Sequence, residues 1–180
     1  KYGIYVQDSG TNQISYNFIG SSQLYGIALS GASASGNRII ENSIGVAPAD
    51  DAATGGGFGT CNPLCFGSFA AIDILSSAHD NYVGAISGSA GTNFIVNNYG
   101  PGVEVESNAG AGNRVYGSNL IHDNNGYLAI DLGTQGPTLN DVGDGDTGGN
   151  HLQNYPVLSQ ARRVYTGVVR LSGSLVAETG

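Results

Sequence analysis

The sequence predicts an all-β protein built as a parallel β-solenoid, in which short strands from successive repeats stack on one another. Composition is the first reason: Gly accounts for 30 of 180 residues, charged residues make up only 11%, and Met and Trp are absent. Gly and Asn are poor helix formers, and their mixture with β-branched and aromatic residues is typical of short strands joined by tight turns. The second reason is a recurring motif of one strand, a small-residue turn, an Asn and another strand.

The recurring motif indicates where the strands begin. The first strand of each repeat is expected at residues 3–6, 26–29, 71–74 and 102–105. Ile4 and Ile27 occupy equivalent positions 23 residues apart, and Val103 and Ile130 lie 27 residues apart. One repeat cannot bury its apolar face alone, whereas stacked repeats bury a continuous core. Leucine-rich repeats need an ordered Leu consensus that is missing here, and a β-sandwich would not repeat one motif so regularly.

An Asn follows each small-residue turn, and a second Asn precedes the next apolar pair. Asn tolerates left-handed backbone conformations, and its amide can hydrogen-bond along a stack of like side chains. The sequence therefore predicts two asparagine columns. Their members are Asn12, Asn37 and Asn113 in the first column and Asn17, Asn42 and Asn119 in the second. The alternative is that these are ordinary turn asparagines in contact with solvent.

Residues 46–68 interrupt the repeats without a strand pattern, so we expect a loop that leaves the stack. Cys61 and Cys65 lie in this loop with three residues between them. That spacing is one residue longer than a C-x-x-C redox motif, and two cysteines without a nearby His are too few for a metal site. The favoured interpretation is a Cys61–Cys65 disulfide formed in an oxidising compartment, and the alternative is two free thiols.

The chain is acidic, with 14 Asp and Glu against 6 Lys and Arg and a net charge of −8. No Lys or Arg occurs between Arg38 and Arg114. Nucleic-acid binding and association with anionic membranes are disfavoured, because both need cations. No apolar run approaches the roughly 20 residues of a membrane span. The chain opens at Lys1 inside an expected strand, without an initiator Met or signal peptide, which favours a trimmed segment of a longer protein.

The composition changes after His151. Arg162, Arg163 and Arg170 are three of the six cationic residues and lie among apolar residues. The pattern predicts two antiparallel strands, at about 164–169 and 171–176. Two strands alone do not form a stable sheet, and the first repeat has no cap, so we expect both ends to pair with neighbouring subunits or domains. Head-to-tail contacts of this kind do not close on themselves and generate filaments.

Three C-terminal stretches carry a family resemblance. They are residues 112–121, which contain GNRV and NLI, residues 128–133 (LAIDLG), and the Asp–Gly tract 140–150 followed by LQNYPVL. Together they resemble bacterial extracellular right-handed parallel β-helix repeat proteins, large surface or secreted proteins in which Ig-like domains follow the helix. The resemblance implies a β-helix over residues 1–160, the start of an incomplete Ig-like domain at 161–180, and an extracellular or cell-surface location.

Parallel β-helices often carry polysaccharide lyases and hydrolases, and acid–base catalysis there needs carboxylates on adjacent repeats. Four carboxylates occupy expected outward positions of this kind: Asp73, Glu104, Glu106 and Asp131. We interpret them as solvated surface residues. His79 and His122, each followed by an Asp, are likewise interpreted as turn residues, and neither a G-x-S-x-G elbow nor a phosphate-binding loop occurs. No catalytic residue is assigned.

The best candidate site is the glycine-rich acidic tract at residues 140–150. Asp141, Asp144 and Asp146 lie within six residues, and Ca²⁺ favours several oxygen ligands from a flexible loop. The tract therefore predicts a calcium site, with calcium as the one expected cofactor. The spacing departs from that of an EF-hand, so the alternative is a turn-rich acidic cap over the last repeat.

These features predict a non-enzymatic structural or adhesive module of a secreted or cell-surface bacterial protein, with an extracellular filament as one expected assembly. The runner-up is a polysaccharide lyase or hydrolase domain, which clustered Asp residues in a groove would favour. A third interpretation is a carbohydrate-binding module that holds a polysaccharide on a flat row of tyrosines. The candidate tyrosines are Tyr5, Tyr16, Tyr25 and Tyr116.

Overall fold

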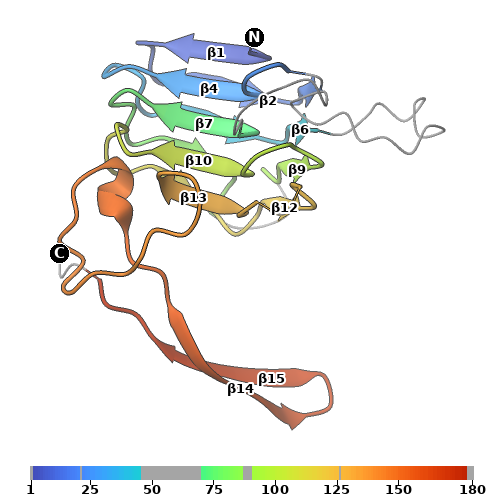
Figure 1. Cartoon of the computed structure of the whole chain (residues 1–180). Coiled ribbons are helices and arrows are strands. Elements are labelled where there is room, and N and C mark those ends of the chain that lie inside the picture. The colour runs from blue at the N-terminus through green and yellow to red at the C-terminus, as the bar shows by residue number, and fades with distance from the viewer. Residues whose placement is uncertain (1, 21, 46–69, 87–90, 126, 178–180) are drawn as a thin grey trace.

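A computed structural model of the chain describes residues 2–20, 22–45, 70–86, 91–125 and 127–177. Three parallel sheets stack strand on strand, and an antiparallel hairpin follows them (Figure 1). Among the described residues the helical structure is limited to a 3-10 turn, η2 (Gly149–Leu152). The predicted all-β fold of stacked parallel strands with a short antiparallel segment is therefore confirmed. No helix in these ranges is long and apolar enough to cross a membrane.

Each sheet takes one strand from each repeat. The first sheet stacks β1 (Ile4–Gln7), β4 (Ile27–Ser30), β7 (Ile72–Leu75), β10 (Val103–Glu106) and β13 (Ile130–Gly133) in that order. The second stacks β2 (Gln13–Ser15), β5 (Arg38–Ile40), β8 (Tyr82–Val83) and β11 (Arg114–Val115). The third stacks β3 (Phe18–Ile19), β6 (Ser43–Ile44), β9 (Phe94–Val96) and β12 (Leu120–His122). We call three consecutive strands, one from each sheet, a rung.

Aliphatic side chains align from rung to rung and form the core. In the first sheet Ile27, Ile72 and Val103 pair in register, and all three are fully buried. Ile39 and Val83 do the same in the second sheet. These residues belong to one hydrophobic cluster that draws members from all three sheets. Because each fully buried aliphatic side chain contributes about 1.5–3 kcal/mol, the aligned columns are a main source of stability.

The predicted asparagine columns are confirmed and are longer than predicted. The Nδ2 group of each member donates to the Oδ1 atom of the next, over 2.8–3.1 Å. The first column is Asn12, Asn37, Asn81 and Asn113, and the second is Asn17, Asn42, Asn93 and Asn119. A further pair, Asn98 and Asn124, joins the rungs after the third sheet through a 2.9 Å bond. The solvated alternative is wrong for Asn37 and Asn42, which are fully buried.

The C-terminal strands form an antiparallel hairpin, but at other positions than predicted. β14 spans Val157–Tyr165 and β15 spans Val168–Ser174, so the turn lies at Thr166 and Gly167. The prediction was wrong because it placed one strand across this turn, where apolar residues continue on both sides. The hairpin also begins before residue 161, inside the predicted first unit. It extends away from the stack (Figure 1), and every residue of both strands is exposed.

The predicted loop at 46–68 and the predicted Cys61–Cys65 disulfide lie outside the described residues.

Candidate functional site

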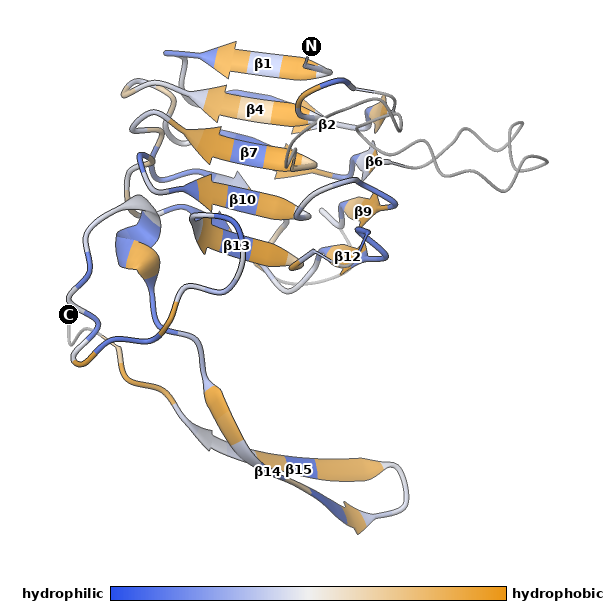
Figure 2. Cartoon of the chain, viewed as in Figure 1, coloured by the Kyte–Doolittle hydropathy of each residue, from blue (hydrophilic) through white to orange (hydrophobic). Residues whose placement is uncertain are grey.

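A column of carboxyl groups runs along the outward face of the first sheet. Asp73 of β7 pairs in register with Glu104 of β10, which pairs with Asp131 of β13. Hydrophilic positions interrupt the hydrophobic strands β7 and β13 in Figure 2. The interpretation as solvated residues is wrong for all three side chains, whose residues are 0%, 9% and 2% exposed. Glu106, predicted for the same stripe, is half-buried.

Burial changes the protonation of this column. It raises the pKa of Asp73 to about 8 and that of Glu104 to about 7, and the charge of Glu106 adds to both increases. Burial also raises the pKa of Asp131, although the backbone N–H of Gly136, which donates to Oδ2 over 2.8 Å, opposes the increase. The column therefore retains part of its protons at neutral pH.

Asp73 is the extreme member of the column. Both of its carboxylate oxygens are buried and neither has a hydrogen-bond partner. The nearby backbone N–H of Ile74 favours the ionised form, but its geometry falls short of a hydrogen bond. A buried carboxylate without partners is costly, so the neutral acid is the form that this environment favours.

Three tyrosines cover the first-rung end of the same face. The ring of Tyr2 stacks on Tyr5 with 4.5 Å between centroids and on Tyr25 with 5.7 Å. Tyr5 pairs with Ala28 and Ala28 with Asp73, so the tyrosines continue the carboxyl column toward β1. Burial, followed by the charge of Asp73, raises the pKa of Tyr25 above its usual range. In each stacked pair, one face of the Tyr2 ring lies against one face of its partner's ring.

The carboxyl column has part of the chemistry of a glycosidase. Neighbouring parallel strands lie about 4.8 Å apart, close to the roughly 5 Å between the two carboxyl groups of a retaining glycosidase. Raised pKa values suit the general acid of such a pair. The burial of Asp73 does not suit this role, because a sugar cannot reach a fully buried carboxyl group.

A second cluster lies on the outward face of the second sheet and combines cations with aromatic rings. Tyr82 pairs in register with Arg38 on one side and Arg114 on the other. The guanidinium of Arg114 lies 5.8 Å from the centroid of the Tyr82 ring, and Tyr116 stacks on Tyr82 at 6.3 Å and an interplanar angle of 8°. These residues and Ile86 line a cavity of about 370 Å³. We call Arg38, Tyr82, Arg114 and Tyr116 the Arg–Tyr strip.

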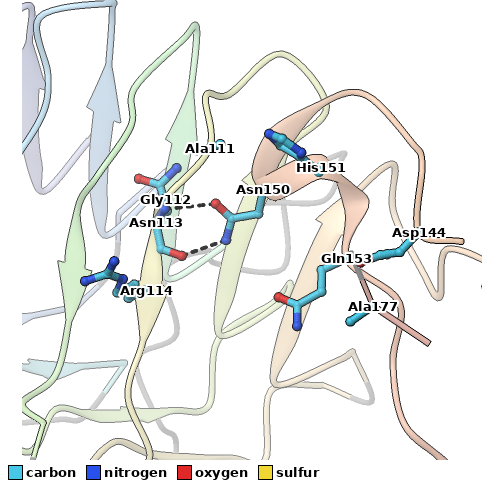
Figure 3. Close-up of a pocket in the computed structure, with 9 residues that line it drawn as sticks. All are labelled: Ala111, Gly112, Asn113, Arg114, Asp144, Asn150, His151, Gln153 and Ala177. Carbon is cyan, nitrogen blue, oxygen red and sulfur yellow. Dashed lines mark hydrogen bonds between the residues drawn. The ribbon is translucent and has the colours of Figure 1, made fainter. Parts of the chain in front are cut away.

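The η2 turn closes the first asparagine column (Figure 3). Asn150 accepts a hydrogen bond from the backbone N–H of Asn113 over 2.9 Å and donates from Nδ2 to the Asn113 carbonyl oxygen over 2.6 Å. It thereby takes the place of a fifth column member without belonging to a strand. A cavity of about 360 Å³ opens beside it, lined by residues that include Arg114 and His151. Arg114 therefore lines both this cavity and that of the Arg–Tyr strip.

The acidic tract is held by its own hydrogen bonds. Asp144 Oδ1 accepts from the backbone N–H of Asn154 over 2.7 Å, and Asp141 Oδ2 accepts from that of Gly145 over 3.1 Å. These contacts fit the alternative of a turn-rich cap better than a cation site. In the part of the chain that the structure describes, no three His, Cys, Asp or Glu side chains, Asp146 included, converge as a metal site would need. Calcium binding stays a prediction.

The other predicted candidates lie apart from one another. His122 Nδ1 lies 2.7 Å from Asp123 Oδ2 and His79 Nε2 3.8 Å from Asp80 Oδ2, and all four side chains are well exposed. The candidate tyrosines do not form one row. Tyr5 lies in β1, Tyr25 shortly before β4 and Tyr116 directly after β11, and Tyr16, 73% exposed, lies between β2 and β3. A flat row of sugar-binding tyrosines is therefore absent at these four positions.

Sequence reasoning missed the alignment of Tyr82 between the two arginines. The sequence places Arg38, Tyr82 and Arg114 at the same point of the motif, directly after a column Asn. This shared position could have predicted that the three side chains lie side by side, because residues at one position of the motif align from rung to rung.

Comparison with family models, with curated proteins and with solved structures finds no match to this chain.

Proposed function

We propose that the chain is a non-enzymatic structural or adhesive module of a secreted or cell-surface protein, built as a right-handed parallel β-helix. The observation that carries the proposal is the asparagine columns, which join every rung to the next and continue to Asn150. Turn side chains that are buried and hydrogen-bonded along the stack stiffen it and are not available for chemistry. The order in which the chain visits the three sheets supports the helical path.

The surface location is supported by the resemblance of residues 112–158 to bacterial extracellular β-helix repeat proteins. Those stretches form β11, β12, β13 and the segment that carries η2, so they cover the end of the stack and its closure.

The hairpin supports self-association. Arg162 lies directly opposite Arg170, and like charges in that position destabilise a strand pair. A two-stranded sheet exposed on both faces is only marginally stable in water. The hairpin strands hold three of the six cationic residues and no acidic residue, whereas 13 of the 14 acidic residues precede Val157. Charge complementarity therefore favours a second copy of the chain, with the hairpin of one copy on the acidic body of the next.

Sedimentation velocity tests this assembly. Wild-type protein should associate as its concentration rises and dissociate as salt screens the charges. The Arg162→Gln/Arg170→Gln variant should remain monomeric over the same range. Arg38→Gln/Arg114→Gln removes the same charge from the body and should associate like the wild type. A wild-type monomer at every concentration and salt level, or equal loss in the control variant, would contradict the assembly.

A polysaccharide hydrolase or lyase is the second candidate, and the carboxyl column is the observation that favours it. An assay of reducing ends released from a panel of polysaccharides separates the two proposals. The structural proposal predicts no release above that of a heat-denatured sample. Release that disappears in Asp73→Asn and Glu104→Gln, while both variants stay folded, would establish the enzyme and overturn the structural proposal.

A further inference from the structure

We propose that the Arg–Tyr strip binds an anionic glycan, with Arg38 and Arg114 contacting its acidic groups and Tyr82 and Tyr116 its sugar rings. The inference rests on the proposed function, because it supplies the ligand of an adhesive module. It concerns the outward face of the second sheet, and not the hairpin through which copies associate.

The two arginines are exceptional in their surroundings. They are exposed cations on the stack of an acidic protein, at positions where the sequence has no other Lys or Arg for 75 residues. Among the described residues, the salt-bridge contacts are those of His79 with Asp80 and His122 with Asp123. Neither arginine forms a salt bridge with a carboxylate in these ranges. Both guanidinium groups thus keep their donors for an external anion, which Arg binds in bidentate fashion when it is a carboxylate or sulfate.

Register sets the spacing of the two cations. Arg38, Tyr82 and Arg114 occupy three consecutive strands, so the arginine Cα atoms lie two strand spacings apart, about 9.6 Å. That distance is comparable with the length of a disaccharide. An extended glycan with acidic groups on successive or alternate sugars can therefore place one group at each arginine while the sugar between them contacts the cavity that Tyr82 and Tyr116 line.

The aromatic pair forms a platform for that sugar. The two rings are near-parallel, with an interplanar angle of 8° and 6.3 Å between their centroids. Together with exposed Ile86 they give the cavity of the strip an apolar lining. Sugar rings have apolar C–H faces that suit such a surface, and Arg114 over Tyr82 links the platform to the charge.

A nucleic acid fits the strip less well than a glycan. Stacked bases and phosphates would also suit Arg and Tyr, but phosphate binding needs many cations and this chain has a net charge of −8. A glycan needs only one acidic group at each of the two arginines, and its sugar rings add contacts with Tyr82 and Tyr116. The nucleic acid is an outcome that the experiment below separates.

The test is isothermal titration calorimetry with three probes at low ionic strength: a galacturonate hexamer, a sulfated heparin-type hexamer and the carboxyl-reduced form of the galacturonate hexamer. The first two distinguish carboxylate from sulfate as the acidic group, and binding of either supports the proposal. The neutral probe should bind at least about tenfold more weakly, since it retains the sugar rings without the charges. Rising salt should weaken binding of the acidic probes.

Variants localise the binding. Arg38→Ala and Arg114→Ala should each weaken binding about tenfold, and Tyr82→Ala should weaken the acidic and neutral probes alike. Arg162→Gln/Arg170→Gln and Tyr16→Ala, matched controls in exposed positions outside the strip, should bind like the wild type. Far-ultraviolet circular dichroism shows whether each variant is folded.

Several outcomes would overturn the proposal: no acidic hexamer binds, the carboxyl-reduced hexamer binds equally, the strip variants bind normally, or a single-stranded oligonucleotide binds more tightly. Loss of binding in Arg162→Gln/Arg170→Gln would also overturn it and assign the glycan to the hairpin. Self-association measured by sedimentation is independent of the strip, so failure here leaves the structural proposal standing.

Discussion

Asp73 faces outward from a strand and yet has no exposed surface. Its neighbours along the column are Ala28 and Glu104. The charge of Glu106 raises the pKa of Asp73, and the charge of Asp73 in turn raises the pKa of the Tyr25 phenol. None of these groups is a cation. The carboxyl group therefore lowers its cost of burial by keeping a proton, and the stability of the fold depends on pH.

Replacement of Asp73 by Asn should remove much of that dependence. The folded pKa of about 8 lies above the unfolded value of about 3.9, so the wild-type stability is complete below about pH 4 and is lost as pH rises through 8. Chemical denaturation should show the unfolding free energy falling by up to about 1.4 kcal/mol per pH unit within that window. Asp73→Asn should exceed wild type above pH 8 and approach it near pH 4.

Asp8→Asn is the matched control, because Asp8 is an exposed carboxyl group and its replacement should leave the pH dependence intact. An unchanged pH profile in Asp73→Asn would show that the column is ionised and solvated after all.

At the level of structural elements, the asparagine columns hold the rungs together. Asn37 accepts from the backbone N–H of Asn12 and donates from Nδ2 to the Ser9 carbonyl oxygen and to Asn81 Oδ1. Asn37→Ala leaves these buried groups without partners, so thermal or chemical unfolding should show a loss of about 2–4 kcal/mol. Asn12→Ala, at the half-buried end of the column, should lose about 1 kcal/mol. Equal losses at both sites would indicate that position in the column has no importance.

A tight turn after the third sheet depends on a glycine. Gly45 has a φ of 81°, and an added Cβ atom would collide with the carbonyl oxygen of Val96 on the neighbouring rung. Gly136 has a φ of 95° but open space around it. Gly136→Ala should therefore cost only the left-handed strain of about 1–2 kcal/mol, and Gly45→Ala should cost at least about 2 kcal/mol more. Calorimetric melting of the two variants checks the difference, and similar melting temperatures would contradict the packing of this turn.

The repeated motif was enough to predict the elements in which it recurs unchanged. Asn12, Asn37 and Asn113 could be aligned because each follows the same turn. Asn93 and Asn98 could not, because the loops between repeats differ in length and shift these residues out of the motif. The burial of Asp73 was also beyond prediction, since alternation along a strand tells which way a side chain points but not what covers it.

At the level of the whole molecule, two surfaces suit contacts with other molecules. An apolar cavity of about 590 Å³ lies at the end of the stack, lined by residues that include Leu128, Ile130 and Tyr155, and Ile130 is 44% exposed there. The hairpin beyond it is basic and exposed on both faces. Both lie toward the same end of the molecule (Figure 1), so a head-to-tail row requires the hairpin of one copy to bind the acidic body of the next rather than this cavity.

Electron microscopy of concentrated protein at low salt tests the central claim, that this is a structural module that assembles through its hairpin. The account predicts rows of subunits with an axial repeat near the length of one subunit for the wild type. It also predicts dispersed single particles for Arg162→Gln/Arg170→Gln. Dispersed wild-type particles at every concentration, or rows that persist in the variant, would contradict it.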